Sequence, residues 1–155
     1  KGTKCFDAIV ECFGTEILDE KGELDRDKLA GIVFSDDARR SELNAIVHPA
    51  VEEEILKKIA KEERKNTNLF IIESALLIET HYDKMCDEIW YVHVEASIRR
   101  KRLIYARGYD AKKVDDIIAA QLPKSMFMKN CDRVIDNSNT FEETQIQLDS
   151  IVADL

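Results

Sequence analysis

The chain has 155 residues, of which 45% are hydrophobic and 35% charged, and its formal net charge at pH 7 is -8. This length is enough to bury one substantial hydrophobic core. The acidic excess disfavours long-range attraction to nucleic acid or to an acidic membrane surface. No apolar run reaches the length needed to span a bilayer. We therefore expect no nucleic acid and no membrane among the partners of this chain. A monomer or weak oligomer is a separate expectation.

The cysteines do not form a metal-binding or disulfide pattern. Cys5, Cys12, Cys86 and Cys131 are scattered without CxxC spacing, which does not favour a zinc site or a disulfide framework. Cys5 and Cys12 are seven residues apart, a spacing that indicates one face of a helix and core packing. Free cysteines at this density are typical of a reducing compartment, so we expect a cytoplasmic location.

Residues 1–68 are predicted to be helical. Apolar residues at helical spacing run up to Gly14, which is expected to stop the first helix. Asp25 follows a turn and is positioned to cap the next helix. Pro49 is expected to interrupt the longest helical pattern and to place His48 at a kink or junction, because the residue before a proline is biased out of the helix.

The second half of the chain alternates between strand and helix patterns. Short apolar runs at 69–72, 87–95 and 132–137 are typical of strands, and the first of them is expected to be covered on both faces. Helical patterns follow at residues 96–108, 110–122 and 140–155. This alternation predicts an α/β fold with a parallel sheet flanked by helices.

Polar residues follow each predicted strand, at 73–77, 95–97 and 136–138. In open α/β sheets, ligands bind beyond the carboxyl ends of the strands. Because parallel strands end at one edge of the sheet, we expect these three segments to cluster in space. Glu73, placed between two apolar runs, is expected to mark the point where the sheet opens towards a ligand.

A basic segment stands out in this acidic chain. It contains Arg99, Arg100, Lys101, Arg102 and Arg107. If Gly108 ends the helix, Arg107 lies at the hinge of a helical hairpin. The planar arginine fork suits phosphate oxygens, but a solvated basic face balanced by residues 112–116 is an equally open interpretation. The sequence contains no GxxxxGK[ST] motif that would surround nucleotide phosphates.

Five stretches, taken in order, resemble one known family. They are GELDRDKLAGIVFSD (22–36), LNAIVHP (43–49), IIESALLIE (71–79), RLIYARGYDAKKVDDIIAAQLP (102–123) and CDRVIDNS (131–138). Together they resemble the dephospho-coenzyme A kinases, P-loop kinases of the nucleoside-monophosphate-kinase type. The resemblance covers nearly the whole chain, and the shared order of the motifs makes it specific although each motif alone is weak.

The chain departs from the family pattern at several positions. Ala75 stands where the family usually has Pro, Ile78 where it often has Phe, Phe127 where a Lys commonly follows the lid glutamine, and Cys131 where it has a small Ala. The P-loop and the acidic segment that carries the base also have no counterpart. We expect a segment of about 45 residues with these features to precede Lys1 in a longer chain, and this chain alone to be inactive.

The resemblance implies a function for the intact protein. Dephospho-coenzyme A kinases transfer the γ-phosphoryl group of ATP to the ribose 3′-hydroxyl of dephospho-coenzyme A, the last step of coenzyme A biosynthesis, and use Mg²⁺. It also implies an acceptor-binding helical region at 1–68, an α/β core at 69–95 and 131–155, and lid helices at 96–130.

The resemblance also assigns roles to individual residues. It places Arg102 and Arg107 in the lid against ATP phosphates, Asn137 near the adenine, and Glu73 on the Mg²⁺ side of the site. The other reading of Glu73 is a carboxylate paired with a backbone group or a basic side chain. The acceptor pocket would be lined by Arg26, His48, Leu76, Leu77 and Glu79.

Two other functions stay open. The 155-residue chain could be a non-catalytic module that binds the acceptor nucleotide or another chain through unpaired strand edges. It could also belong to a kinase of the same superfamily with a different acceptor, although the combination of GELDR and HP speaks against that reading.

Overall fold

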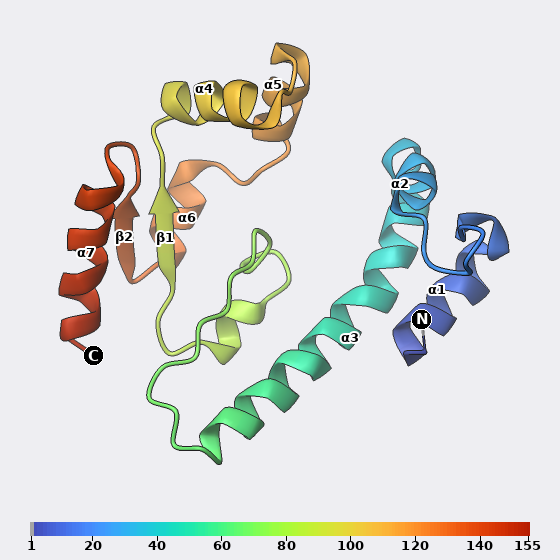
Figure 1. The fold of residues 1–155 in the computed structure, drawn as a ribbon, viewed down its shortest axis with the longest axis horizontal. Helices are drawn as coiled ribbons and strands as arrows, with labels where there is room; N and C mark the ends of the chain where they lie inside the picture. The colour runs from blue at the N-terminus through green and yellow to red at the C-terminus, as the bar shows by residue number, and fades with distance from the viewer. Residues whose placement is uncertain (1) are drawn as a thin grey trace. The chain divides into compact units, whose positions relative to one another are not determined.

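We analysed a computed structural model that describes residues 2–155. The chain divides into two compact units, here called the N-terminal unit, which ends at Thr80, and the C-terminal unit, which begins at His81. None of the helices among the described residues is both long and apolar enough to cross a membrane. Figure 1 shows the elements of each unit.

The N-terminal unit is a helical assembly. Its elements are α1 (Lys4–Phe13), the short 3-10 helix η1 (Thr15–Ile17), α2 (Arg26–Ser35) and α3 (Asp37–Glu63) (Figure 1). The buried core consists of Ile9, Phe13, Ile17, Leu29 and Val33, so all of α1, η1 and α2 contribute to it. Cys5 and Cys12 pack against this core, as their spacing predicted.

The ends of the first helices follow the predicted capping residues. Gly14 terminates α1 with φ 83°, a conformation that L side chains rarely adopt. Asp25 caps α2: its Oδ1 accepts hydrogen bonds from the backbone N–H groups of Asp27 and Lys28, both at 3.1 Å. Both predictions are confirmed, because each depends on residues within one helical turn.

Helix α3 does not break at Pro49, so the predicted interruption at His48 is wrong. The helix runs for 27 residues with Pro49 inside it (Figure 1). Pro49 has no N–H to donate to the Ala45 carbonyl, which normally disfavours a helix interior. The turn before the proline is held in place by Ile46 and Val47, which pack against the core of the N-terminal unit. Tertiary packing therefore outweighs the local effect of the proline.

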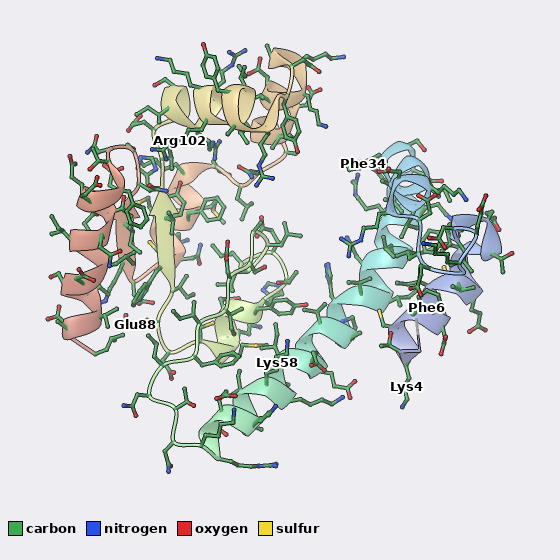
Figure 2. The ribbon with its side chains drawn as sticks, viewed as in Figure 1. Lys4, Phe6, Phe34, Lys58, Glu88 and Arg102 are labelled. Atoms are coloured by element: carbon green, nitrogen blue, oxygen red, sulfur yellow. The ribbon has the colours of Figure 1, made fainter. Side chains whose placement is uncertain are left out.

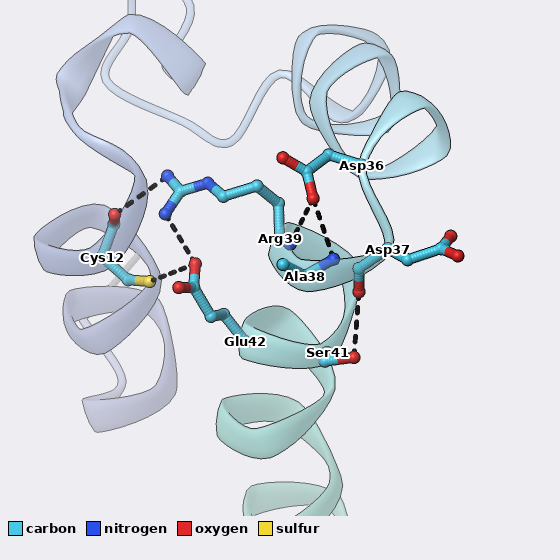
Figure 3. Close-up of polar contacts among 7 residues, drawn as sticks. All are labelled: Cys12, Asp36, Asp37, Ala38, Arg39, Ser41 and Glu42. Atoms are coloured by element: carbon cyan, nitrogen blue, oxygen red, sulfur yellow. Dashed lines mark hydrogen bonds and ion pairs between the residues drawn. The ribbon is translucent and has the colours of Figure 1, made fainter.

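Polar contacts join α3 to α1 (Figure 3). Arg39 donates from Nη1 to Glu42 Oε2 at 2.6 Å and from Nη2 to the Cys12 carbonyl at 3.2 Å. Its guanidinium lies 4.3 Å from the centre of the Phe13 ring. A cation over an aromatic face and a charge-assisted hydrogen bond together fix the start of α3 on the core.

The segment Leu69–Ile72 is not a strand, contrary to the prediction. It has no regular structure, and Leu69, Phe70 and Ile71 are exposed, Ile71 to 71%. A strand needs a hydrogen-bonded neighbour, and the part of the chain that the structure describes supplies no ladder partner here. Glu73 therefore follows an irregular segment rather than the end of a strand.

The C-terminal unit contains the sheet. Its elements are η2 (Tyr82–Met85), β1 (Trp90–His93), α4 (Ala96–Arg107), α5 (Ala111–Ala119), α6 (Lys124–Asn130), β2 (Arg133–Asp136) and α7 (Phe141–Ala153). The strands β1 and β2 pair in parallel, with Trp90 opposite Arg133 and His93 opposite Asp136. The two later strand predictions and the parallel pairing are confirmed. The short helix α6 was not predicted, because seven residues carry little periodicity.

Candidate functional site

The carboxyl ends of β1 and β2 meet, as the topology rule requires. The Glu95 N–H donates to Ser138 Oγ at 2.9 Å, and the Ser138 N–H donates to Asp136 Oδ1 at 2.9 Å. The Asn137 N–H donates to the His93 carbonyl at 2.8 Å. Two of the three polar segments predicted to cluster thus lie together. The third, 73–77, belongs to the N-terminal unit, and its place near them stays a prediction.

The polar groups at this edge favour an ionised carboxylate. Hydrogen bonds from the hydroxyl and the backbone N–H of Ser138 lower the pKa of Asp136, and the nearby His93 and Lys124 add to this effect. Ser138 is 9% exposed and connects the ends of both strands. Its hydroxyl accepts a hydrogen bond from the Glu95 N–H and donates one to the Asp136 carboxylate. The strand ends are therefore held by a connected polar network.

Arg102 links α4 to the loop after β2. Its Nη1 donates to the Asn137 carbonyl at 2.6 Å and its Nη2 to the Asn139 carbonyl at 3.2 Å. Arg102 lies in the middle of α4 (Ala96–Arg107), and Figure 2 labels it below this helix. Arg102 and Asn137, both predicted to bind ATP, are thus in direct contact although they are 35 residues apart. Their roles in ATP binding stay a prediction.

Arg107 lies at the hinge of a helical hairpin, as expected. It is the last residue of α4, and Gly108 follows as the cap in the left-handed conformation with φ 64°. Arg100, on the same helix, has a structural role instead. It pairs with Asp115 on α5 at 2.9 Å, and this contact raises the pKa of the guanidinium and lowers the pKa of the carboxylate. The basic segment is therefore partly balanced by residues 112–116 and partly directed at the strand ends.

A pocket of about 400 Å³ lies beside β1, the start of α4, the end of α5 and α6. Tyr91 and Phe127 form one wall, with their rings stacked at 5.0 Å and 7°. His93 and Lys124 also line it, and Lys124 Nζ lies 3.1 Å from His93 Nε2. The sequence did not predict this pocket. Its members come from four separate elements, and a lone histidine within an apolar strand pattern is typical of a satisfied sheet residue.

The predicted acceptor residues occupy several parts of the N-terminal unit. Arg26 borders a pocket of about 350 Å³ together with Thr3, Cys5, Phe6, Ile9, Glu23 and Leu24. His48 is half-buried on α3. Leu76, Leu77 and Glu79 lie in the turns at 75–81, where Thr80 Oγ1 donates to the Leu76 carbonyl at 2.7 Å. Their common role in acceptor binding stays a prediction.

Solved structures define the class of protein to which this fold belongs. The crystal structure of TT1252 from Thermus thermophilus superposes with a TM-score of 0.79 at 27% sequence identity, covering 96% of this chain and 75% of that chain. A dephospho-CoA kinase from Campylobacter jejuni has a TM-score of 0.67 at 19% identity over 94% of this chain and 73% of that chain, which supports the fold alone. The predicted class, an α/β fold of the P-loop kinase type, is confirmed.

The sequence comparisons narrow this class to one family. The family model described as dephospho-CoA kinase matches residues 1–143. The dephospho-CoA kinase of Symbiobacterium thermophilum is 36% identical over 149 residues, which are 96% of this chain and 62% of that protein. That of Oceanobacillus iheyensis is 36% identical over 151 residues, 97% of this chain and 76% of that protein. The chain belongs to the dephospho-CoA kinase family, as the sequence motifs predicted.

Proposed function

We propose that the full-length protein transfers the γ-phosphoryl group of ATP to the ribose 3′-hydroxyl of dephospho-coenzyme A. Family membership supports this reaction, because the match extends over nearly the whole chain. The structural observation that supports it most directly is the contact between Arg102 and Asn137. Two residues that the family resemblance assigns to one ATP site lie next to each other.

The proposed ATP site uses the strand ends and the lid hairpin. Arg102, fixed by the carbonyls of Asn137 and Asn139, would present its remaining N–H groups to the nucleotide. Arg107, exposed beside Gly108, can move with the hairpin and would neutralise charge on the phosphates. Positioning and charge neutralisation supply most of the catalysis in phosphoryl transfer.

Mg²⁺ belongs to this proposal as the ion that would neutralise phosphate charge. In kinases, Mg²⁺ keeps several waters and takes one or two carboxylates together with substrate phosphates. Glu73 is exposed and makes no hydrogen bond or ion pair with any residue in the range 2–155, so both of its oxygens are available. A single free carboxylate fits a site that water and phosphates complete.

The acceptor would be held by the N-terminal unit. Arg26 supplies a permanent positive charge at the rim of a pocket with apolar walls, which suits a phosphate-bearing acceptor. His48 on α3 and the three residues Leu76, Leu77 and Glu79 would complete the site. Arg26→Ala should raise KM for the acceptor more than it lowers kcat, whereas Arg40→Ala, on the exposed start of α3, should change neither.

The direct test is a product assay with the full-length protein. With ATP, Mg²⁺ and dephospho-coenzyme A, it should form ADP and the 3′-phosphorylated product, detected by mass. Absence of product would contradict the proposal. Arg107→Ala should lower kcat more than acceptor affinity, whereas Lys101→Ala, on the same helix, serves as the control. An unchanged rate in Arg107→Ala would reject its role in the lid.

A second function, acceptor binding without catalysis, is favoured by the compact N-terminal unit and its pocket. Calorimetric titration of the 155-residue chain separates the two possibilities. Binding of dephospho-coenzyme A without binding of ATP would support a non-catalytic module. Binding of neither would contradict that reading.

We also propose a cytoplasmic location, small-molecule substrates as the only partners, and a monomer or weak oligomer. The acidic net charge of -8 supports the absence of nucleic-acid partners. Light scattering of the full-length protein across a concentration series would measure its mass, and a stable oligomer at low concentration would contradict the proposed state.

A further inference from the structure

The pocket beside β1 contains basic side chains from three separate elements. His93 comes from β1, Arg99 from α4 and Lys124 from α6, and all three line the same volume of about 400 Å³. His93 is 9% exposed, so one of these groups is fixed inside the protein rather than on its surface. A hollow lined by several basic groups in an acidic protein suggests a specific anionic ligand.

Lys124 and His93 are in direct contact in this pocket. Lys124 Nζ lies 3.1 Å from His93 Nε2, and Glu95 Oε1 lies 3.4 Å from the same nitrogen. His93 Nδ1 lies 3.4 Å from the Tyr91 hydroxyl. The ammonium group of Lys124 has only donors, so a ligand that supplies acceptor oxygens suits it.

The two permanent cations of the pocket have no ion pair. Within residues 2–155, no carboxylate oxygen lies within 4.0 Å of the Lys124 or Arg99 nitrogens. Arg99 Nη1 donates to Gln121 Oε1 at 3.0 Å, but its Nε is buried and has no hydrogen-bond partner among the described residues. A buried N–H of a charged group without an acceptor is unfavourable. A ligand that carries several acceptor oxygens would correct this.

We propose that this pocket binds a phosphate group, with Lys124 as its principal cation and Arg99 as the second. Phosphate oxygens are acceptors only and form short, strong hydrogen bonds with Lys and Arg. Phe127, three residues after Lys124, stacks on Tyr91 and closes the apolar wall. Residues three apart share one face of a helix. Lys124 therefore places its positive charge on the same face of α6 as the uncharged ring of Phe127. The inference depends on the proposed function only for the molecule that carries the phosphate.

The carboxylates near the pocket do not favour a cation instead. Glu95 Oε1 lies 3.4 Å from His93 Nε2, but its side chain is 62% exposed and can turn towards water. Asp136 is already engaged by Ser138. Two unpaired cations that line the same pocket, Lys124 and Arg99, would repel a metal ion. The balance of charge therefore favours an anion.

The test measures binding without turnover, in the full-length protein. Pyrophosphate is titrated calorimetrically into the wild type, Lys124→Met and Lys129→Met, the last removing the same charge from the same helix outside the pocket. Lys124→Met should weaken pyrophosphate binding by about tenfold to a hundredfold, the usual effect of losing one charge-assisted hydrogen bond. Lys129→Met should stay within about twofold of the wild type. An effect below twofold in Lys124→Met, or an equal loss in both variants, would overturn the proposal.

Further titrations identify the molecule that carries the phosphate group and test whether the pocket prefers an anion. Loss of ATP binding in Lys124→Met with dephospho-coenzyme A binding unchanged would assign the site to the nucleotide, and the reverse result would assign it to the acceptor. Glu95→Gln should tighten pyrophosphate binding about two- to threefold by removing a repelling charge; weaker binding would overturn the proposal. Unchanged melting temperatures exclude misfolding. Loss of phosphoryl transfer with intact pyrophosphate binding would contradict the proposed function alone.

Discussion

Two short apolar segments of this protein, Leu69–Ile72 and β1 (Trp90–His93), take different structures. In the first, Ile71 is 71% exposed and the backbone has no ladder partner within residues 2–155. In the second, the backbone pairs with β2 and His93 is buried to 9% exposure. Both segments have the composition of a strand.

The difference lies in the contacts that the rest of the chain makes with each segment. Before β1, the Ile89 N–H donates to Asp132 Oδ2 at 2.8 Å, and Glu88 accepts from Arg133 at 2.9 Å. These contacts fix the register over a separation of more than 40 residues. Among residues 2–155, no such contact is present at 69–72. Apolar composition makes a segment able to be a strand, but a partner makes it one.

The largest loss of stability is expected from a substitution on the buried side of the strand pair. Ile135 in β2 is 2% exposed, so Ile135→Ala should lower the free energy of unfolding by about 2–5 kcal/mol. The matched change Ile71→Ala, in the irregular segment, should stay within about 0.5 kcal/mol. Urea unfolding of both variants measures the difference. Equal losses would show that Leu69–Ile72 is packed as firmly as the strands.

Hydrogen exchange tests the same contrast on the backbone. The most protected amide of β2 (Arg133–Asp136) should exchange at least about a hundredfold more slowly than the amides of Leu69–Ile72, a difference of about 3 kcal/mol in opening free energy. The measurement is made by mass spectrometry on the 155-residue chain. Comparable protection in both segments would show that a ladder partner does not distinguish them.

A smaller effect is expected from the link between the strand ends. Ser138→Ala removes the acceptor of the Glu95 N–H and a donor to Asp136, which should lower the free energy of unfolding by about 1–3 kcal/mol. Ser125→Ala, an exposed serine on α6, should change stability by less than about 0.5 kcal/mol. If both variants melt at the same temperature, the network does not stabilise the strand pair.

The smallest expected effect is on how the melting temperature depends on pH. The hydrogen bond from Arg133, with one from Trp90, lowers the pKa of Glu88 from its ordinary value of 4.5. A depressed folded pKa contributes stability above the unfolded pKa that is lost as pH falls through the folded pKa. The melting temperature of the wild type should therefore fall more steeply below pH 4.5 than that of Glu88→Gln. Glu52→Gln, which removes an exposed carboxylate, should keep the wild-type slope; parallel curves for all three would contradict the role of Glu88.

Features that depend on near neighbours or on motifs could be predicted from the sequence. The ends of α1 and α2 at Gly14 and Asp25 follow from one turn of backbone chemistry. The hinge at Gly108 was predictable for the same reason, whereas the apolar patterns of β1 and β2 indicated only that these segments could form strands. Five motifs in the family's order were enough to identify the family.

The remaining features depend on residues far apart in the chain, so tertiary contacts set them. The irregular course of Leu69–Ile72 depends on whether a partner strand is present, which its own four residues cannot encode. The passage of α3 through Pro49 depends on packing against the core of the N-terminal unit. The pocket in which Lys124 meets His93 joins a helix to a strand 31 residues away, and no local pattern in the sequence signals such a contact.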